Sequence, residues 1–187
     1  MHVDISYDLR SKAESLANVV GESLWQQLPT VDTLLPVSDN IADMILGMNW
    51  QPSLCVIGAD GLPSVQTAGN VLRTNTDLKL SFRIPPGIDV DPLEPILKQI
   101  LEENPPYGAE VSFSPDSSAN GFHSPPLDGE VKRAITEASE LLTGRPPLAT
   151  WIGGTIPFMA MMQSRYPNAK FLCTGASGPG NNAHGPD

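Results

Sequence analysis

The chain has 187 residues, of which 40% are hydrophobic and 17% charged, with a formal net charge of −10. This composition is typical of a globular protein with a core, and the negative charge argues against nucleic acid as a partner because phosphates would be repelled. The opening MHVDISYDLRSK is polar and no apolar run approaches the roughly 18 residues of a membrane span, so we expect a cytoplasmic protein that does not enter a membrane.

Two helices are predicted before residue 51. The first covers about residues 9–28, because apolar side chains recur at three- and four-residue spacing from Leu9 to Leu24. The second covers SDNIADMILGMNW, with Ser38 or Asp39 as its N-cap. Both helices are amphipathic and need a partner surface.

A strand, strand, helix, strand order follows up to residue 115. SLCVIGADGLP and TDLKLSFRI read as strands, and the alternation in the second predicts one buried face made of Leu78, Leu80, Phe82 and Ile84. DVDPLEPILKQILEE reads as a helix with Asp91 as its cap and an apolar face that packs on the sheet, and GAEVSFS as a returning strand. This order is most of a ferredoxin-like α+β sandwich without its opening strand and helix.

The pattern changes after the connector SPDSSANGFHSPP. A helix is predicted over about 127–143, ending at Gly144, followed by a short strand near 148–152, a helix in GGTIPFMAMMQSRYP and a buried strand in AKFLC. Alternating helices and strands indicate part of an α/β layer. We therefore expect an α+β chain with two parts, residues 1–115 and residues 116–187.

The two cysteines, Cys55 and Cys173, both lie in apolar runs. This placement favours buried free thiols over a disulfide or a redox role.

Several residues are candidates for chemistry, and each has a plainer interpretation. The two glycines and the threonine of GGTIP precede a helix, where free N–H groups and the helix dipole would accept a carboxylate or phosphate, although a plain turn is commoner. Alone, Arg83 reads as a solvated arginine, Asn70 as a turn residue and His123 as a connector residue. His184, in the closing loop GPGNNAHGPD, could equally have no role.

Generic catalytic signatures are missing from the sequence. It has no Gly-x-Ser-x-Gly elbow, phosphate-binding loop or His-Glu-x-x-His motif. Its three histidines, at positions 2, 123 and 184, lack the pairing typical of a zinc site.

Four stretches in order, however, resemble one enzyme family. They are NWQPSLCVIGADGLPSVQTAGNVLRTNTDLKLSFRIPPGID, NPPYGAEVSF, GGTIPFMAMM and CTGASGPGNNAHGPD. Together they resemble the two-metal peptidase family of aminoacylase, acetylornithine deacetylase and carnosine dipeptidase (peptidase family M-twenty), and most closely its carnosine-dipeptidase-like branch. In that family a catalytic α/β domain binds two zinc or related divalent ions, and an inserted α+β lid domain mediates dimerisation.

The resemblance implies roles for particular residues. Arg83 matches the lid arginine that grips the terminal carboxylate of the substrate, and Asn70 the lid residue that reaches a partner subunit's active site. His123 matches a histidine near the substrate. Gly153, Gly154 and Thr155 match the helix-start turn that receives the substrate, although Gly154 stands where a serine is common. His184 matches a ligand of one metal ion.

The family's other metal ligands and its glutamate general base have no counterpart in this sequence. We therefore expect a C-terminal fragment of a metal-dependent dipeptidase or amidohydrolase, with residues 1–115 as a homodimerising lid and residues 116–187 as the last part of the catalytic domain. The isolated chain is expected to be inactive and to bind no stoichiometric metal. The alternative is a non-catalytic dimerisation or binding module that keeps the lid fold.

Overall fold

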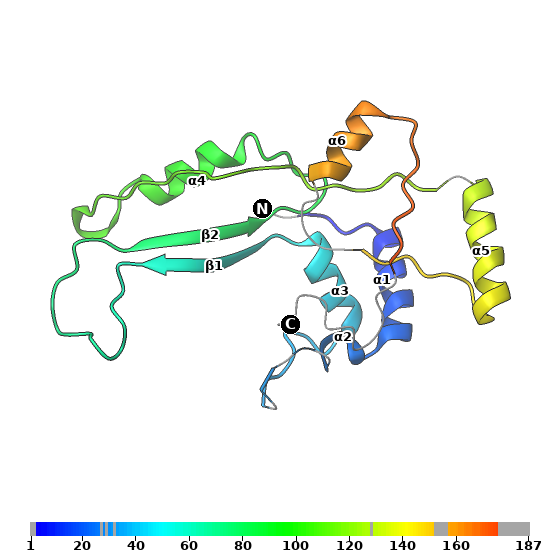
Figure 1. Ribbon diagram of the computed structural model, residues 1–187, viewed down its shortest axis with the longest axis horizontal. Helices are drawn as coiled ribbons and strands as arrows, with labels where there is room; N and C mark the ends of the chain where they lie inside the picture. The colour runs from blue at the N-terminus through cyan, green and yellow to red at the C-terminus, as the bar shows by residue number, and fades with distance from the viewer. Residues whose placement is uncertain are drawn as a thin grey trace.

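The computed structural model describes residues 3–26, 28, 30–31, 33–127, 129–151 and 157–175. It is a mixed α/β structure in which a long β-hairpin and several helices extend from a small helical core (Figure 1). The elements are α1 (Tyr7–Val20), α2 (Ser23–Gln26), α3 (Ile41–Trp50), β1 (Ser53–Asp60), β2 (Asp77–Arg83), α4 (Leu93–Glu102), a 3-10 turn at Pro106–Gly108, α5 (Gly129–Thr143) and α6 (Pro157–Arg165).

The core lies where α1 packs on α3. Ala13 and Ile45 are 0% and 1% exposed, and partly buried side chains of α1 and α2 surround them. The predicted helix over 9–28 is broken, because Gly21 takes a positive φ of 52° and ends α1 at Val20. The expected cap of α3 was also wrong: Asn40, rather than Ser38 or Asp39, accepts the amide hydrogen bond at the start of this helix.

The hairpin confirms the first two predicted strands. β1 pairs antiparallel with β2, with Ser53 opposite Arg83, Asp60 opposite Asp77 and a bulge between Val56 and Gly58. The predicted buried face of β2 was wrong. Leu78 is 54% exposed, and Leu80, Phe82 and Ile84 are only partly buried, because no further described strand or closely packed helix covers the hairpin.

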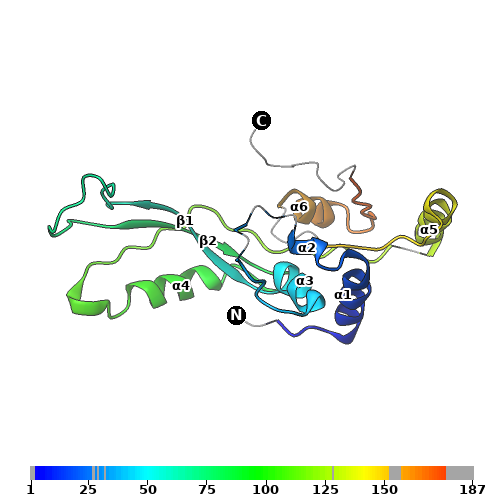
Figure 2. The same cartoon turned by 90° about the horizontal axis from the view of Figure 1, so that it is seen from below.

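Helix α4 lies on one side of the hairpin (Figure 2). Asp91 does not cap it, since Pro92 occupies the N-cap without a side-chain hydrogen bond. The apolar face of α4 was expected to pack on the sheet, but none of its residues is buried. After α4 the chain runs back along the hairpin as an extended segment, which we call the returning segment (residues 109–119), and the strand predicted there does not form.

Two contacts hold the returning segment to α4. The amide of Phe113 donates a hydrogen bond of 2.7 Å to the carboxylate of Glu102, and the Lys98 ammonium donates one of 3.4 Å to the Phe113 carbonyl. Within α4, Lys98 also donates a hydrogen bond of 2.6 Å to Glu102. The two hydrogen bonds that Glu102 accepts, the one from Lys98 first, hold its pKa below the ordinary value because they favour the ionised carboxyl. The link is therefore electrostatic and lies at the surface.

The C-terminal part forms its helices but not its predicted strands. α5 ends at Thr143 as expected, and α6 begins at Pro157. Residues 148–151 and 169–173 are extended without pairing, and residue 152 lies outside the described part of the chain. Cys55 and Cys173 are free and exposed rather than buried, because the segments that carry them are uncovered.

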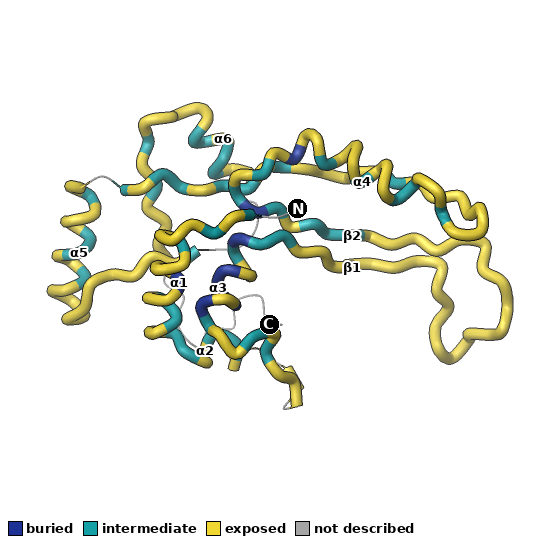
Figure 3. The backbone as a smooth tube through the Cα atoms, turned by 180° about the vertical axis from the view of Figure 1, so that it is seen from behind, coloured by how far each residue is buried: buried dark blue, intermediate teal, exposed yellow. Residues whose placement is uncertain are grey.

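The molecule exposes far more surface than a compact protein of its size. Its accessible surface is 14742 Å², against about 8,700 Å² expected for a folded monomer of 20.0 kDa. Burial is concentrated in the small region around α1 and α3, while the hairpin, α4 and α5 are largely exposed (Figure 3). None of the described helices is both long and apolar enough to cross a membrane.

Candidate functional site

An aromatic cluster joins the connector to the helical core. The ring of Trp50 meets His123 edge to face at a centroid distance of 4.9 Å, and meets Trp151 edge to face at 6.0 Å. Trp50 is the last residue of α3 and is 5% exposed, whereas His123 is exposed on the connector. The buried Trp50 therefore gives His123 a fixed aromatic surface while the imidazole stays accessible from outside.

The Trp50 indole also carries a polar group. Its Nε1 is buried, and no hydrogen-bond partner for it is found in the described structure. A buried N–H without an acceptor costs about 1–3 kcal/mol. Trp50 thus brings both an aromatic surface and an uncompensated donor to this cluster.

Arg83 approaches the same region through a backbone bridge. β2 ends at Arg83, and three residues later Pro86 forms a parallel bridge with Gly121, two residues before His123. A Cβ on Gly121 would lie only 2.7 Å from the Pro85 carbonyl carbon and the Pro86 nitrogen, so glycine is needed for the two backbones to meet. The bridge brings the end of β2 and the connector to one end of the hairpin.

Asn70 lies elsewhere. It is exposed in the loop 61–76 that joins β1 to β2 and extends beyond the opposite end of the hairpin (Figure 1). The seven residues of β2 span about 20 Å, so Asn70 and Arg83 of one chain are too far apart to contact one small substrate.

The other predicted site residues lie outside the described residues. These are the helix-start turn, Gly153, Gly154 and Thr155, and the expected metal ligand His184. Among the described residues, no group of three or more histidine, cysteine, aspartate or glutamate side chains is placed to hold a metal ion. The described residues therefore do not fit a complete metal site, and we assign no metal-dependent step to them.

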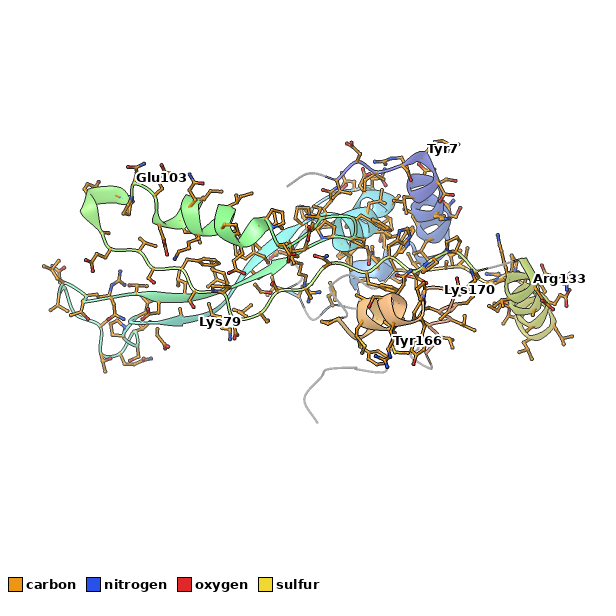
Figure 4. All side chains as sticks on the ribbon, turned by 90° about the horizontal axis from the view of Figure 1, so that it is seen from above. Tyr7, Lys79, Glu103, Arg133, Tyr166 and Lys170 are labelled. Atoms are coloured by element: carbon orange, nitrogen blue, oxygen red, sulfur yellow. The ribbon has the colours of Figure 1, made fainter. Side chains whose placement is uncertain are left out.

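Acidic side chains gather at the far end of the hairpin, away from the aromatic cluster. Asp60 and Asp77 face each other across the two strands, and Lys79 makes a 3.0 Å ion pair with Asp116 of the returning segment. In Figure 4, Lys79 lies on the hairpin, whereas Arg133 projects from α5 at the other end of the molecule. Of the described candidates for substrate binding, Arg83 and His123 thus lie away from this acidic end.

Sequence reasoning missed the two tryptophans and Gly121. Trp50 ends an apolar helical run and Trp151 follows a proline-rich stretch, so both read as ordinary hydrophobic residues. The contacts of Trp50 with His123 and with Trp151 join residues far apart in the chain, which no local pattern encodes. Gly121, within SSANGFH, carries a turn-like signal but gives no hint of its partner.

Two known proteins are similar to this chain. A cysteinylglycine-S-conjugate dipeptidase of Corynebacterium striatum is 26% identical over 161 residues, covering 86% of this chain and 34% of that protein. The crystal structure of human carnosine dipeptidase 1 matches with a TM-score of 0.57 and 19% identity, covering 87% of this chain and 34% of that one. Both matches are to dipeptidases, as the resemblance to the M-twenty family predicts. The resemblance to this dipeptidase family is thereby confirmed.

The match to the dipeptidase family is partial in length. The chain spans about a third of the length of each of the two dipeptidases, and no family model matches it. The structural likeness shows that the chain has a fold similar to the corresponding third of carnosine dipeptidase 1.

Proposed function

We propose that this chain is part of a longer metal-dependent dipeptidase and that its own residues bind the substrate rather than activate water. The observation that carries the proposal is the exposed surface of 14742 Å², about 6,000 Å² more than a compact protein of this mass exposes. A stable isolated domain does not leave so much surface wet, because apolar burial provides most of the stabilisation of a fold.

The exposed side chains are the kind that further polypeptide would cover. On α5, Leu141 and Leu142 are 86% and 82% exposed, although this helix is amphipathic. Fully burying one such leucine contributes about 1.5–3 kcal/mol. Outside the matched third, each of the two dipeptidases has about twice the length of the matched part, which is enough to supply the covering surface.

In this proposal residues 1–115 form the lid and residues 116–187 the last part of the catalytic domain. The strand, strand, helix and returning segment agree with a ferredoxin-like lid that lacks its opening strand and helix. The connector that carries His123 then links the two parts.

We propose the substrate-binding roles that the resemblance implies, and the position of the bridge supports those of Arg83 and His123. Arg83 and His123 flank the Pro86–Gly121 bridge, where a guanidinium and an imidazole can bind the carboxylate and the carbonyl of a dipeptide. Gly153, Gly154 and Thr155 would add a helix start that binds the same carboxylate, and His184 would join ligands from the remainder of the protein. The two divalent ions, zinc in our proposal, would supply an activated water when bound.

The position of Asn70 supports a homodimer. It cannot contact the substrate that Arg83 of its own chain would bind, so a shared site requires Asn70 from a partner. The loop that carries it also exposes apolar side chains that a partner could cover: Leu62, Val65, Val71 and Leu72. We propose that this loop reaches into the active site of a second subunit.

The test uses the longer reading frame obtained by extending the coding sequence upstream. The encoded protein should hydrolyse a cysteinylglycine S-conjugate or carnosine with zinc, manganese or cobalt. Arg83→Ala should raise KM by about 12- to 140-fold, because a charge-assisted hydrogen bond contributes about 1.5–3 kcal/mol. The matched control is Arg73→Ala, in the hairpin loop.

Equal KM values for the Arg83→Ala and Arg73→Ala variants would show that Arg83 does not bind the substrate. A longer protein without any hydrolysis would refute the enzyme proposal and leave the non-catalytic dimerisation module.

A further inference from the structure

The indole of Trp50 is held rigidly by the helical core. Trp50 is the last residue of α3, is 5% exposed, and belongs to the same buried cluster as Ala13 and Ile45. Its ring also meets Trp151 edge to face at a centroid distance of 6.0 Å. A side chain packed on several sides at the density of a protein interior keeps one orientation. Trp50 is therefore a fixed support for any residue that packs on it from outside the core.

The connector is held in place just before His123 by contacts that do not involve this indole. Pro86 forms its backbone bridge with Gly121, and the ring of Phe122 meets Phe171 edge to face at a centroid distance of 5.5 Å. These contacts fix the connector backbone up to the residue before the histidine. The contact between the indole and the imidazole therefore concerns the side chain of His123 more than the path of the backbone.

The imidazole of His123 has little else to orient it. His123 is exposed, and its imidazole makes no hydrogen bond or ion pair with the part of the chain that the structure describes. An exposed side chain without a partner samples several rotamers. The edge-to-face contact with Trp50, at a centroid distance of 4.9 Å, lies within the range of about 4.5–7 Å that aromatic pairs prefer. This contact selects one orientation of the imidazole.

The buried donor of Trp50 is a second and independent observation. The Nε1 atom is buried, and no hydrogen-bond partner for it is found among the described residues. Such groups are uncommon in folded proteins, and departures of this kind from the rules of packing are expected at functional sites. Stability of the core alone therefore does not account for a tryptophan at this position.

We propose that Trp50 is a positioning residue, which holds the imidazole of His123 in the orientation that binds the substrate. Trp50 acts through His123 and does not touch the substrate itself, because it is only 5% exposed. The inference rests on the proposed substrate-binding role of His123 and adds the residue on which that role depends. It also gives the small core of α1 and α3 a part in the reaction.

The first test measures the orientation of His123 in the 187-residue chain by NMR. Three-bond couplings should report one χ1 rotamer of His123 in the unmodified chain and in Trp50→Phe, which keeps an aromatic ring, and averaged rotamers in Trp50→Leu. The matched control is Asn40→Ala, which removes the cap at the other end of α3 and should keep the single rotamer. Nuclear Overhauser contacts between Phe122 and Phe171 should persist in all variants, because the connector backbone stays in place.

The second test is kinetic and uses the longer protein. Trp50→Leu should lower kcat/KM by about 10- to 100-fold, because a small misplacement of a binding group has an effect of this size. Asn40→Ala should leave kcat/KM unchanged. In a His123→Ala background, Trp50→Leu should cause no further loss, since the residue through which it acts is gone.

A single His123 rotamer in Trp50→Leu would overturn the proposal. Averaged rotamers in Asn40→Ala as well would assign the effect to a weakened helix and would also overturn it, as would equal kinetic losses from Trp50→Leu with and without His123. If the couplings behave as expected but the longer protein hydrolyses no dipeptide, the proposed function fails and the positioning of His123 by Trp50 stands.

Discussion

The close approach at Gly121 gives a prediction that can be worked out from the structure. In Gly121→Ala the new methyl carbon would lie 2.7 Å from two backbone atoms of Pro85 and Pro86, so the two backbones must separate. Overpacking of this kind costs about 1–3 kcal/mol. The amide of Val90, which donates to Asn120 at 2.8 Å, reports this separation directly. A cost of 1–3 kcal/mol corresponds to an increase of about 5- to 140-fold in the exchange rate of this amide, measured by NMR.

The control is Gly69→Ala, because nothing lies within 4 Å of a Cβ added at position 69. This variant should leave the exchange of the Val90 amide unchanged. If Val90 exchanges at the same rate in Gly121→Ala as in the unmodified chain, the bridge does not hold the connector against β2. The proposal that Arg83 and His123 act at the same end of the hairpin would then lose its physical basis.

Three further predictions concern stability. Ile45→Ala should lower the free energy of unfolding by about 2–5 kcal/mol in urea denaturation, because Ile45 is 1% exposed. Met48→Ala, on the same helix at a position 62% exposed, should change it little. Equal losses in the two variants would contradict the assigned core. Asn40→Ala should cost about 1 kcal/mol in the same assay through loss of the cap on α3, and an unchanged midpoint would argue against that cap. The pKa of Glu102 is lowered in the fold, so the hydrogen bond that it accepts from the Phe113 amide stabilises the structure above the ordinary carboxyl pKa and is lost as the pH falls through the pKa of the folded state. The protection of the Phe113 amide against hydrogen exchange, corrected for the intrinsic effect of pH, should therefore fall in acid. Constant protection would refute this.

The sequence predicted the elements whose signals are local. α1 and α3 follow three- and four-residue apolar spacing, and α5 ends where Gly144 begins. β1 and β2 were predicted because each finds its partner within the same hairpin. In all these cases the stabilising contacts lie close together in the chain or depend on one amphipathic face.

The strands that failed depend on partners farther away. The returning segment and residues 148–151 and 169–173 have apolar patterns that fit strands, but no described neighbour completes their ladders. The same cause explains why Leu78 and Cys173 are exposed. A sequence pattern states that a surface can be buried and does not state whether the covering polypeptide is present.

The candidate site shows the same division. Arg83 and Asn70 were identified through the resemblance, and the structure adds that they lie at opposite ends of the hairpin. The contacts of Trp50 with His123 and with Trp151 could not be read from sequence, because they join three distant segments. The roles of all these residues in binding stay predictions.

Turnover by the isolated 187-residue chain is the most direct test of the central claim that this chain is one part of a dipeptidase. The chain should show no hydrolysis of a dipeptide with zinc, manganese or cobalt, and after dialysis it should retain far less than one metal ion per chain, because its described residues assemble no set of metal ligands. Hydrolysis by this chain, accompanied by stoichiometric metal and abolished by a chelator, would contradict the account and show that these residues form a self-sufficient active site.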